Sequence, residues 1–174
     1  MLLENDKAID FIVSDYLNNQ VTLSDYKGKK VLLSFFRGAA CPFCNMRVQE
    51  LINNYHKFEE KGIVIISFFA STKEEINEYA GKQNAPFAII PDPTFGLYKK
   101  YGIEQSSFGI LKVMLKPLKM VRMMQSGFFN LKSSKDKPIV PADFLIDENQ
   151  MILKTYYGKD FGDHMSIEDI LNRR

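Results

Sequence analysis

The sequence has few of the residues on which several classes of protein depend. It contains two cysteines, two histidines and no tryptophan in 174 residues. Two cysteines cannot supply the disulfide framework of a small secreted domain. A zinc site needs four ligands at close range, and beyond the cysteines the chain offers only His56 and His164, which are not in ligand-like spacing. The sequence therefore predicts neither a disulfide scaffold nor a metal site.

Long hydrophobic runs are also missing. The longest, VLLSFF and IVIISFFA, fall far short of the ~18 residues that a transmembrane helix requires. The first residues, MLLENDKAIDF, carry acids and a lysine where a secretion signal has a basic start and then an apolar stretch of roughly 7–15 residues. We therefore expect a cytoplasmic protein, with residues 1–174 forming a single domain, because domains have about 100–200 residues.

The order of the predicted elements is typical of an α/β fold. Seven segments have the length and apolar character of strands: residues 8–13, 21–23, 31–36, 63–69, 87–90, 142–146 and 151–156. Apolar spacing predicts helices over 42–61 and 95–101, and capping signals predict helices that begin near Thr72 and Ser166. The expected architecture is a central mixed sheet flanked by helices, with an N-terminal hairpin and a C-terminal hairpin.

The two cysteines lie in the motif Cys41-Pro42-Phe43-Cys44, where the strand 31–36 leads into the first long helix. Thiol-disulfide exchange needs one thiol that ionises near neutral pH and a second thiol within reach to resolve the mixed disulfide. The amide groups and dipole of a helix N-terminus lower the pKa of a cysteine from ~8.5 to between ~3.5 and ~7.5. The motif therefore predicts a redox-active pair; two buried, inert cysteines are the alternative.

Most of the chain resembles the thioredoxin superfamily and, within it, the peroxiredoxin-like AhpC/TSA branch of alkyl hydroperoxide reductases and thiol-specific antioxidants. The segment VTLSDYKGKKVLLSFFRGAACPFC is similar to the entry of that branch into its cysteine loop. FAIIPDPTFGLYKKYGI is similar to a later segment of the branch, and VPADFLIDENQMI resembles its closing hairpin. The resemblance implies a thioredoxin-like fold and thiol-based redox chemistry, with no metal or organic cofactor.

The resemblance permits two alignments of the cysteine loop. Typical peroxiredoxins carry Pro-x-x-x-Thr-x-x-Cys, and ending this pattern on Cys44 places Arg37 at the proline and Cys41 at the threonine. These proteins also have an arginine immediately before the closing hairpin strand, where this chain has Pro141 and Ala142. In this alignment the set of residues that activates a peroxide is incomplete.

Thioredoxin-type oxidoreductases instead combine a CxxC motif with a cis-proline that faces it from the start of the hairpin. Val140-Pro141 matches that position, which implies a cis peptide bond and a groove for the substrate backbone. The alternative is an ordinary edge proline before a strand. Pro42 and Phe43 resemble the Pro-Tyr pair of glutaredoxins, whereas Phe35 replaces the buried acid of thioredoxins.

The second alignment assigns the two cysteines different roles. Cys41, at the helix start, would be the nucleophile, and Cys44 would be more buried and less ionised. Arg37 would stabilise the Cys41 thiolate, or would be a solvent-facing loop residue. His56 is expected on the surface of the helix.

Residues 105–137 form a basic, methionine-rich insertion before the C-terminal hairpin. It carries seven Lys or Arg and one Asp, a formal charge of +6, whereas the whole chain carries +2. An apolar stripe follows a helical period, with three lysines outside it: Leu111, Met114, Leu115 and Leu118, and Lys112, Lys116 and Lys119. Pro117 predicts a break, or a helix with this proline in its first turn.

Three interpretations of the insertion are open. The stripe could pack on the core with its lysines in solvent, line a wall for an apolar substrate or partner, or dock on anionic membrane. Packing on the core is the interpretation that we favour. Nucleic-acid binding is not predicted, because interleaved aromatic residues and a recognisable motif are lacking.

The sequence predicts a thiol-disulfide oxidoreductase in which Cys41 attacks a disulfide or a hydroperoxide and Cys44 resolves the product. A reductant such as thioredoxin or glutathione would restore the dithiol. The sequence leaves open whether the protein forms a homodimer. The competing hypothesis is a thioredoxin-fold binding module with idle cysteines, in which the basic insertion captures a partner or a membrane surface.

Overall fold

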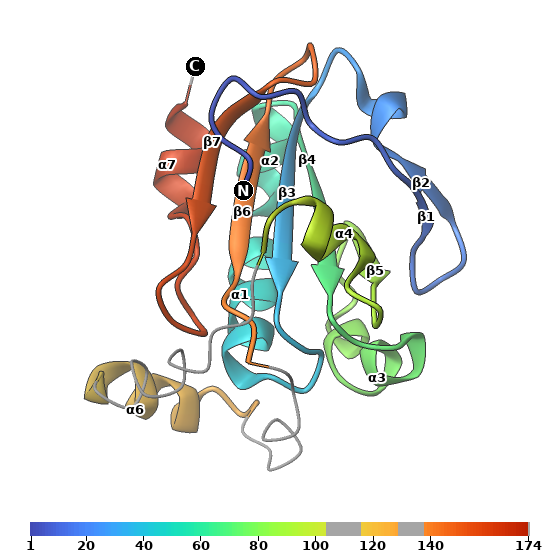
Figure 1. Cartoon of the computed structure of the whole chain (residues 1–174). Helices are drawn as coiled ribbons and strands as arrows, with labels where there is room; N and C mark the ends of the chain where they lie inside the picture. Colours follow the sequence, from blue (N-terminus) through green and yellow to red (C-terminus); the bar gives the residue numbers. More distant parts are fainter. Residues whose placement is uncertain (104–115, 129–137, 174) are drawn as a thin grey trace.

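The structure is a computed structural model that describes residues 1–103, 116–128 and 138–173. Its centre is a mixed sheet with the strand order β5-β4-β3-β6-β7 (Figure 1). The five strands are β3 (Lys30–Phe36), β4 (Ile63–Phe69), β5 (Ala88–Pro91), β6 (Ala142–Ile146) and β7 (Ile152–Tyr157). Strands β3, β4 and β5 run parallel, and β6 is antiparallel to β3 and to β7. The predicted mixed sheet is thus confirmed.

The remaining elements cover the sheet or extend it. The N-terminal hairpin consists of β1 (Ile12–Ser14) and β2 (Gln20–Thr22), and the short helix η1 (Leu23–Tyr26) follows it. The other helices are α1 (Pro42–Asn53), α2 (Tyr55–Glu60), α3 (Lys73–Glu78), η2 (Ala80–Gln83), α4 (Gly96–Lys100), α6 (Pro117–Gln125) and α7 (Ile167–Asn172). No helix among these described segments is both long and apolar enough to cross a membrane.

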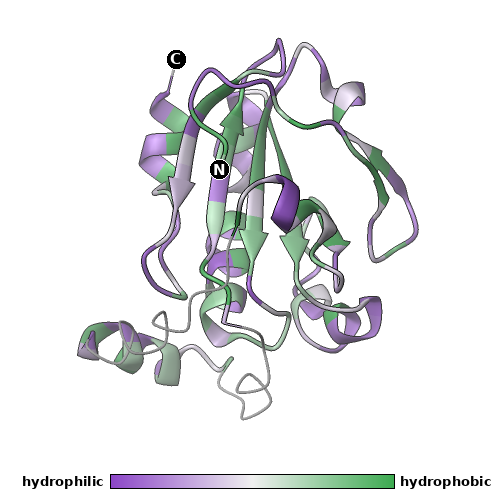
Figure 2. Ribbon diagram, in the orientation of Figure 1, coloured by the Kyte–Doolittle hydropathy of each residue, from purple (hydrophilic) through white to green (hydrophobic). Residues whose placement is uncertain are grey.

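Alternating side chains of β3 divide the core into two clusters. Leu33 and Phe35 face the cluster that α4 and the N-terminal hairpin cover, whereas Leu32 and Phe36 face the cluster beneath α1, α2, α3 and α7. The green central strands in Figure 2 show this apolar character. Both cysteines belong to the second cluster. The predicted central sheet between helices therefore places the CPFC motif on one defined face.

Aromatic pairs fix the register of β3 against β4. Phe35 lies beside Phe68 and Phe36 beside Phe69 in the parallel register. Each pair stacks with ring centroids 4.7 Å apart, on opposite faces of the sheet. Stacked pairs of this kind contribute about 0.5–1.5 kcal/mol beyond the burial of their area. They hold the carboxyl ends of the two strands together, immediately before the cysteine loop.

The single helix predicted over residues 42–61 is two helices in the structure. Helix α1 ends at Asn53, and Asn54 has φ −105° and ψ 6° before α2 begins. The Asn54 side chain donates to the carbonyl of Glu50 over 2.9 Å. An asparagine that bonds to nearby backbone in this way competes with the helical ladder, which accounts for the break.

The structure also revises the prediction for the basic insertion. Helix α6 begins at Pro117, as one of the predicted alternatives required. Leu118 is 75% exposed, so the packing predicted for it is wrong, and Met123 is the buried residue of this helix. Leu111, Met114 and Leu115 lie outside the described residues.

Candidate active site

The loop 37–41 carries the chain from β3 into α1 and places Cys41 at the N-cap of that helix. Pro42 occupies the first helical position, where its missing N–H costs nothing. Cys44 lies in the first turn and is hydrogen-bonded to Cys41. Both cysteines are free thiols. The CPFC motif thus holds a reduced pair whose sulfur atoms are already in contact.

The environment of Cys44 disfavours its thiolate form, as expected of a resolving thiol. Burial, the hydrogen bond to Cys41 and the charge on Cys41 raise the pKa of Cys44 well above its ordinary value, although Arg37 acts in the opposite direction. The expectation that Cys44 would be more buried than Cys41 is wrong, since both have 0% exposure. Any reaction with a bulky substrate therefore requires the surrounding loops to open.

Arg37 lies next to the cysteine pair and does not face solvent. Its side chain is buried, and Nη1 lies 3.9 Å from the Cys41 sulfur. The guanidinium carbon lies 4.3 Å above the centre of the Phe161 ring. A guanidinium stacked on an aromatic ring is held in place and keeps its charge. Arg37 is thus positioned to stabilise negative charge on Cys41.

The segment between β7 and α7 covers the motif. Phe161 stacks on Arg37, and Phe43 packs so closely on Gly162 that a Cβ atom added there would lie 3.2 Å from the Phe43 ring. His164 contacts the ring of Phe36, with a centroid distance of 4.9 Å. These contacts explain why both sulfur atoms are shielded from solvent.

Hydrogen bonds from neighbouring polar side chains hold the cysteine loop in place. Asn45 donates to the carbonyls of Ala39 and Cys41 over 2.7 and 2.9 Å. Gln83 donates to the Asn45 side chain over 2.9 Å, and Ser71 accepts from the Ala39 amide. Because these groups are buried or half-buried, their hydrogen bonds fix the loop conformation.

Pro141 does not have the predicted cis peptide bond. All peptide bonds within residues 1–103, 116–128 and 138–173 are trans. Pro141 is buried immediately before β6, and its carbonyl accepts a 2.8 Å hydrogen bond from the Gly158 amide. This bond continues the pairing of β6 with the chain after β7. Pro141 therefore directly precedes a strand, as in the alternative interpretation, but this strand lies between β3 and β7 and not at the edge of the sheet.

Comparison with known proteins assigns this arrangement to a family. The model of the AhpC/TSA family matches residues 5–155. The chain belongs to the AhpC/TSA family. This match includes the N-terminal hairpin, the CPFC motif and most of the C-terminal hairpin, so it confirms the resemblance drawn from the sequence.

Individual relatives in the family are distant. The chain is 27% identical over 101 residues to the chloroplastic peroxiredoxin Q of Sedum lineare, an alignment that covers 58% of this chain and 54% of that protein. It is 26% identical over 110 residues to peroxiredoxin Bcp of Escherichia coli, covering 62% and 70%. The chain thus spans about half the length of the first of these relatives.

Solved structures show the same fold. The peroxidoxin BcpB of Mycobacterium tuberculosis superimposes with a TM-score of 0.68 at 15% identity, covering 90% of this chain and 86% of that one. A protein from Chlorobium tepidum, described as a thiol:disulfide interchange protein DsbE, gives 0.63 at 21% identity, with the same coverage. These likenesses confirm the predicted thioredoxin-like fold.

A buried polar cluster beside α1 was missed in the sequence. Asp143, on the central strand β6, accepts hydrogen bonds from Ser34, from Nδ1 of His164 at 3.1 Å and from the Met165 amide at 2.7 Å. Arg47 donates to the Met165 carbonyl over 2.7 Å. A charged residue inside the predicted strand 142–146 is the signal that could have indicated this cluster.

The charges around Asp143 set its ionisation. Burial raises the pKa of the carboxyl, but His164, Arg47 and Ser34 together outweigh this and hold the pKa below its usual value. Asp143 is therefore a carboxylate, and Nδ1 of His164 carries the proton that it shares with Asp143. Nε2, the other ring nitrogen of His164, takes no part in the bond to Asp143.

Helix α6 is attached to the segment that covers the cysteines. The buried carboxylate of Asp160 accepts from Lys116 at 2.7 Å and from Lys119 at 2.9 Å. Burial raises the pKa of Asp160, but the two lysines and the Gly162 amide reverse this and lower it. Lys116 and Lys119 thus anchor α6 through Asp160, although their side chains remain partly exposed to solvent, as predicted.

Replacing Asp160 with Asn is expected to release α6 without unfolding the sheet. A neutral amide cannot satisfy two ammonium groups, and the hydrogen bonds of a charged group are stronger than those of a neutral one. Amide hydrogen exchange in residues 117–125 should accelerate at least about tenfold, while β3 and β4 remain unchanged. Unaltered exchange in α6 would show that the Asp160 bonds do not anchor it.

Other positions singled out in the sequence lie apart from this site. His56 is exposed on α2, as predicted. Within the described segments, no group of three or more His, Cys, Asp or Glu residues is arranged to hold a metal ion.

Proposed function

We propose that this chain is a thiol-disulfide oxidoreductase in which Cys41 is the nucleophile and Cys44 is the resolving thiol. The observation that carries the proposal is the hydrogen-bonded free thiol pair at the start of α1, with the Arg37 guanidinium 3.9 Å from the Cys41 sulfur. A neighbouring cation favours the thiolate form of Cys41, whereas burial keeps Cys44 protonated. This asymmetry favours attack by Cys41.

The reaction with a disulfide takes two exchange steps. The Cys41 thiolate attacks one substrate sulfur, a mixed disulfide forms and one substrate thiolate leaves. The Cys44 thiol then loses its proton and attacks Cys41, which releases the second substrate thiolate and forms the Cys41–Cys44 disulfide. The protein is oxidised by two electrons, and an external dithiol such as a thioredoxin would return them.

A hydroperoxide is the second candidate oxidant, because the relatives in the AhpC/TSA family include peroxiredoxins. In that reaction Cys41 takes the terminal oxygen as a sulfenic acid, and an alcohol leaves. Cys44 then condenses with the sulfenic acid, forming the same disulfide and releasing water. Both oxidants therefore lead to one product in the protein.

The proposal is tested by assaying the protein against a panel of disulfides and hydroperoxides with thioredoxin or glutathione as reductant. Thiol counting and peptide mass spectrometry of each product should show two free thiols before oxidation and an internal Cys41–Cys44 disulfide afterwards. Cysteines that remain alkylatable after exposure to every oxidant would contradict the proposal.

Replacing Arg37 with Gln is expected to slow the first exchange step about tenfold at pH 7, because one charge close to a sulfur changes the thiolate population by at least about this factor. Arg37→Lys keeps the charge and should recover part of the rate. Stopped-flow reaction with a small disulfide measures the step. Equal rates for Arg37→Gln and the natural protein would exclude the electrostatic role.

A thioredoxin-fold binding module with idle cysteines is the competing hypothesis. The observation in its favour is the exposed apolar side of α6, which consists of Leu118, Val121 and Met124. Cysteines that do not form a reversible disulfide, together with retention of the protein by anionic vesicles at low salt, would favour this hypothesis. Reactive cysteines would favour the oxidoreductase.

A further inference from the structure

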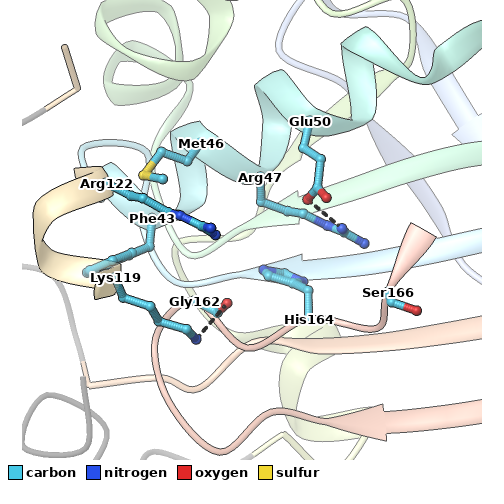
Figure 3. A pocket seen from close by; sticks show the side chains of 9 residues that line it. All are labelled: Phe43, Met46, Arg47, Glu50, Lys119, Arg122, Gly162, His164 and Ser166. Carbon is cyan, nitrogen blue, oxygen red and sulfur yellow. Dashed lines mark hydrogen bonds and ion pairs between the residues drawn. The ribbon is translucent and has the colours of Figure 1, made fainter. Parts of the chain in front are cut away.

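A cavity of about 350 Å³ lies beside the first two turns of α1. It lies between α1, α6 and the segment after β7, and its lining includes Phe43, Met46, Arg47, Lys119, Arg122 and His164 (Figure 3). Phe43 separates the two cysteines in the sequence, so the cavity adjoins the redox motif. Its volume is within the range of pockets that hold small organic ligands.

Two buried polar atoms of this cavity's walls lack a hydrogen-bond partner among the described residues. They are Nε2 of His164 and Nε of Arg47. The two side chains are only 4% and 6% exposed. A buried polar atom without a partner costs about 1–3 kcal/mol, so small side-chain rotations that turn these two atoms toward a ligand in the cavity would be favourable.

The charges around the cavity determine the sign of charge that a ligand should carry. Glu50 lies 2.7 Å from Arg47 and neutralises it, whereas Lys119 shares the single carboxylate of Asp160, 2.9 Å away, with Lys116. Arg122 has no acidic partner within the part of the chain that the structure describes, and in Figure 3 it extends from α6 toward His164. The cavity therefore has an excess of positive charge, which suits an anionic group.

The side chains that line the cavity further restrict the chemical class of the ligand. A guanidinium presents paired donors that match a carboxylate, and Nε2 of His164 can take up a proton and donate it to the same group. Phe43 and Met46 supply apolar surface on the side of α1. An organic molecule with a carboxylate and a short apolar chain would satisfy both parts.

We propose that this cavity binds the carboxylate of a small organic disulfide, with Arg122 and His164 holding the charged end and Phe43 directing the chain toward the cysteine pair. The redox part of this inference rests on the proposed function of Cys41 and Cys44. The binding part does not, because the cavity contains neither cysteine.

Binding is tested with octanedioate, a redox-inert analogue of 3,3′-dithiodipropionate in which two methylene groups replace the two sulfurs. Titration of the reduced protein, followed by calorimetry or NMR, should show saturable binding of octanedioate and none of the neutral 1,8-octanediol. Arg122→Gln should weaken binding at least about tenfold. This variant keeps the fold, because the Arg122 side chain is exposed.

Two controls make the titration decisive. Lys99→Gln removes the same charge from an exposed position on α4 and should leave the affinity unchanged. Inorganic phosphate should bind more weakly than octanedioate. Equal binding of phosphate would overturn the carboxylate assignment, and absence of octanedioate binding would overturn the site.

Substrate selectivity is tested with the disulfides themselves. The natural protein should have a higher kcat/KM for 3,3′-dithiodipropionate than for the neutral 2-hydroxyethyl disulfide, and Arg122→Gln should lower this ratio at least about tenfold. Octanedioate binding without reduction of either disulfide would leave the site intact and contradict the proposed function. Reduction of both disulfides at equal kcat/KM, without octanedioate binding, would contradict the site alone.

Discussion

Cys41→Ser is expected to abolish turnover with disulfides and hydroperoxides, by more than about a thousandfold, whereas Cys44→Ser should stop after the first chemical step. Without the Cys41 thiolate the chain has no nucleophile at the helix N-cap. Without Cys44 the attack by Cys41 still occurs, but the product cannot be resolved. Cys44→Ser should therefore accumulate a mixed disulfide or a sulfenic acid on Cys41.

The peroxiredoxin-type alignment makes the opposite prediction. If Cys44 were the peroxidatic cysteine, Cys41→Ser would retain single-turnover reaction with hydroperoxide and collect a sulfenic acid on Cys44. We favour Cys41, because Arg37 lies 3.9 Å from its sulfur, whereas burial and the neighbouring sulfur raise the pKa of Cys44 and suppress its thiolate. The threonine and arginine with which typical peroxiredoxins activate a peroxide are absent from this chain, which also favours Cys41 over Cys44 as the nucleophile.

Rapid mixing of each single variant with substoichiometric peroxide or disulfide, followed by trapping and peptide mapping, identifies the reacting sulfur. Serine is a close isostere, so both variants should keep the native circular dichroism spectrum and serve as controls for each other. A reactive Cys41→Ser beside an unreactive Cys44→Ser would reverse the assignment.

The sequence predicts best those elements that are determined by residues close to one another in the chain. Residues 63–69 form β4 with the predicted bounds, because a continuous apolar run of this length permits little else. The Thr72 cap is also confirmed, since Thr72 and Glu75 form a reciprocal capping box at the start of α3. Cys41 at the start of α1 follows from the same kind of reasoning.

The features that the sequence did not predict depend on contacts between distant segments. His164 lies 21 residues from Asp143 in the chain, and only the approach of the segment after β7 to β6 brings the two together. Lys119 and Asp160 are 41 residues apart, so periodicity placed Lys119 in solvent when it binds a buried acid. The cavity beside α1 arises from both contacts, and no motif could have indicated it.

Asp143 is the residue whose loss should destabilise this fold most. Its carboxylate is fully buried on a central strand and accepts from Ser34, His164 and Met165, and it interacts electrostatically with Arg47. Removing one partner from a buried charged network leaves the other charges uncompensated. These groups come from β3, β6, α1 and the segment before α7, so the network joins two inner strands to the elements that cover one face of the sheet.

Asp143→Asn is expected to lower the free energy of unfolding by about 3–5 kcal/mol at pH 7, the loss found when one partner of a buried ion pair is removed. The amide has the shape of the carboxylate but only one acceptor oxygen, so it cannot accept all of the existing hydrogen bonds. Chemical denaturation at pH 7 measures the difference. Asp25→Asn, at an exposed acid on η1, should change stability by less than about 0.5 kcal/mol.

The same network predicts the dependence of this difference on pH. The pKa of Asp143 is lowered in the folded state, so its carboxylate contributes stability above the unfolded pKa of about 3.9, and the contribution is lost as pH falls through the folded pKa. The destabilisation by Asp143→Asn should therefore be complete at pH 5–7 and shrink in more acidic solution. An Asp143→Asn variant as stable as the natural protein at pH 7 would mean that Asp143 is buried in its protonated form, because only a neutral acid could be replaced by an amide without removing a negative charge from beside Arg47.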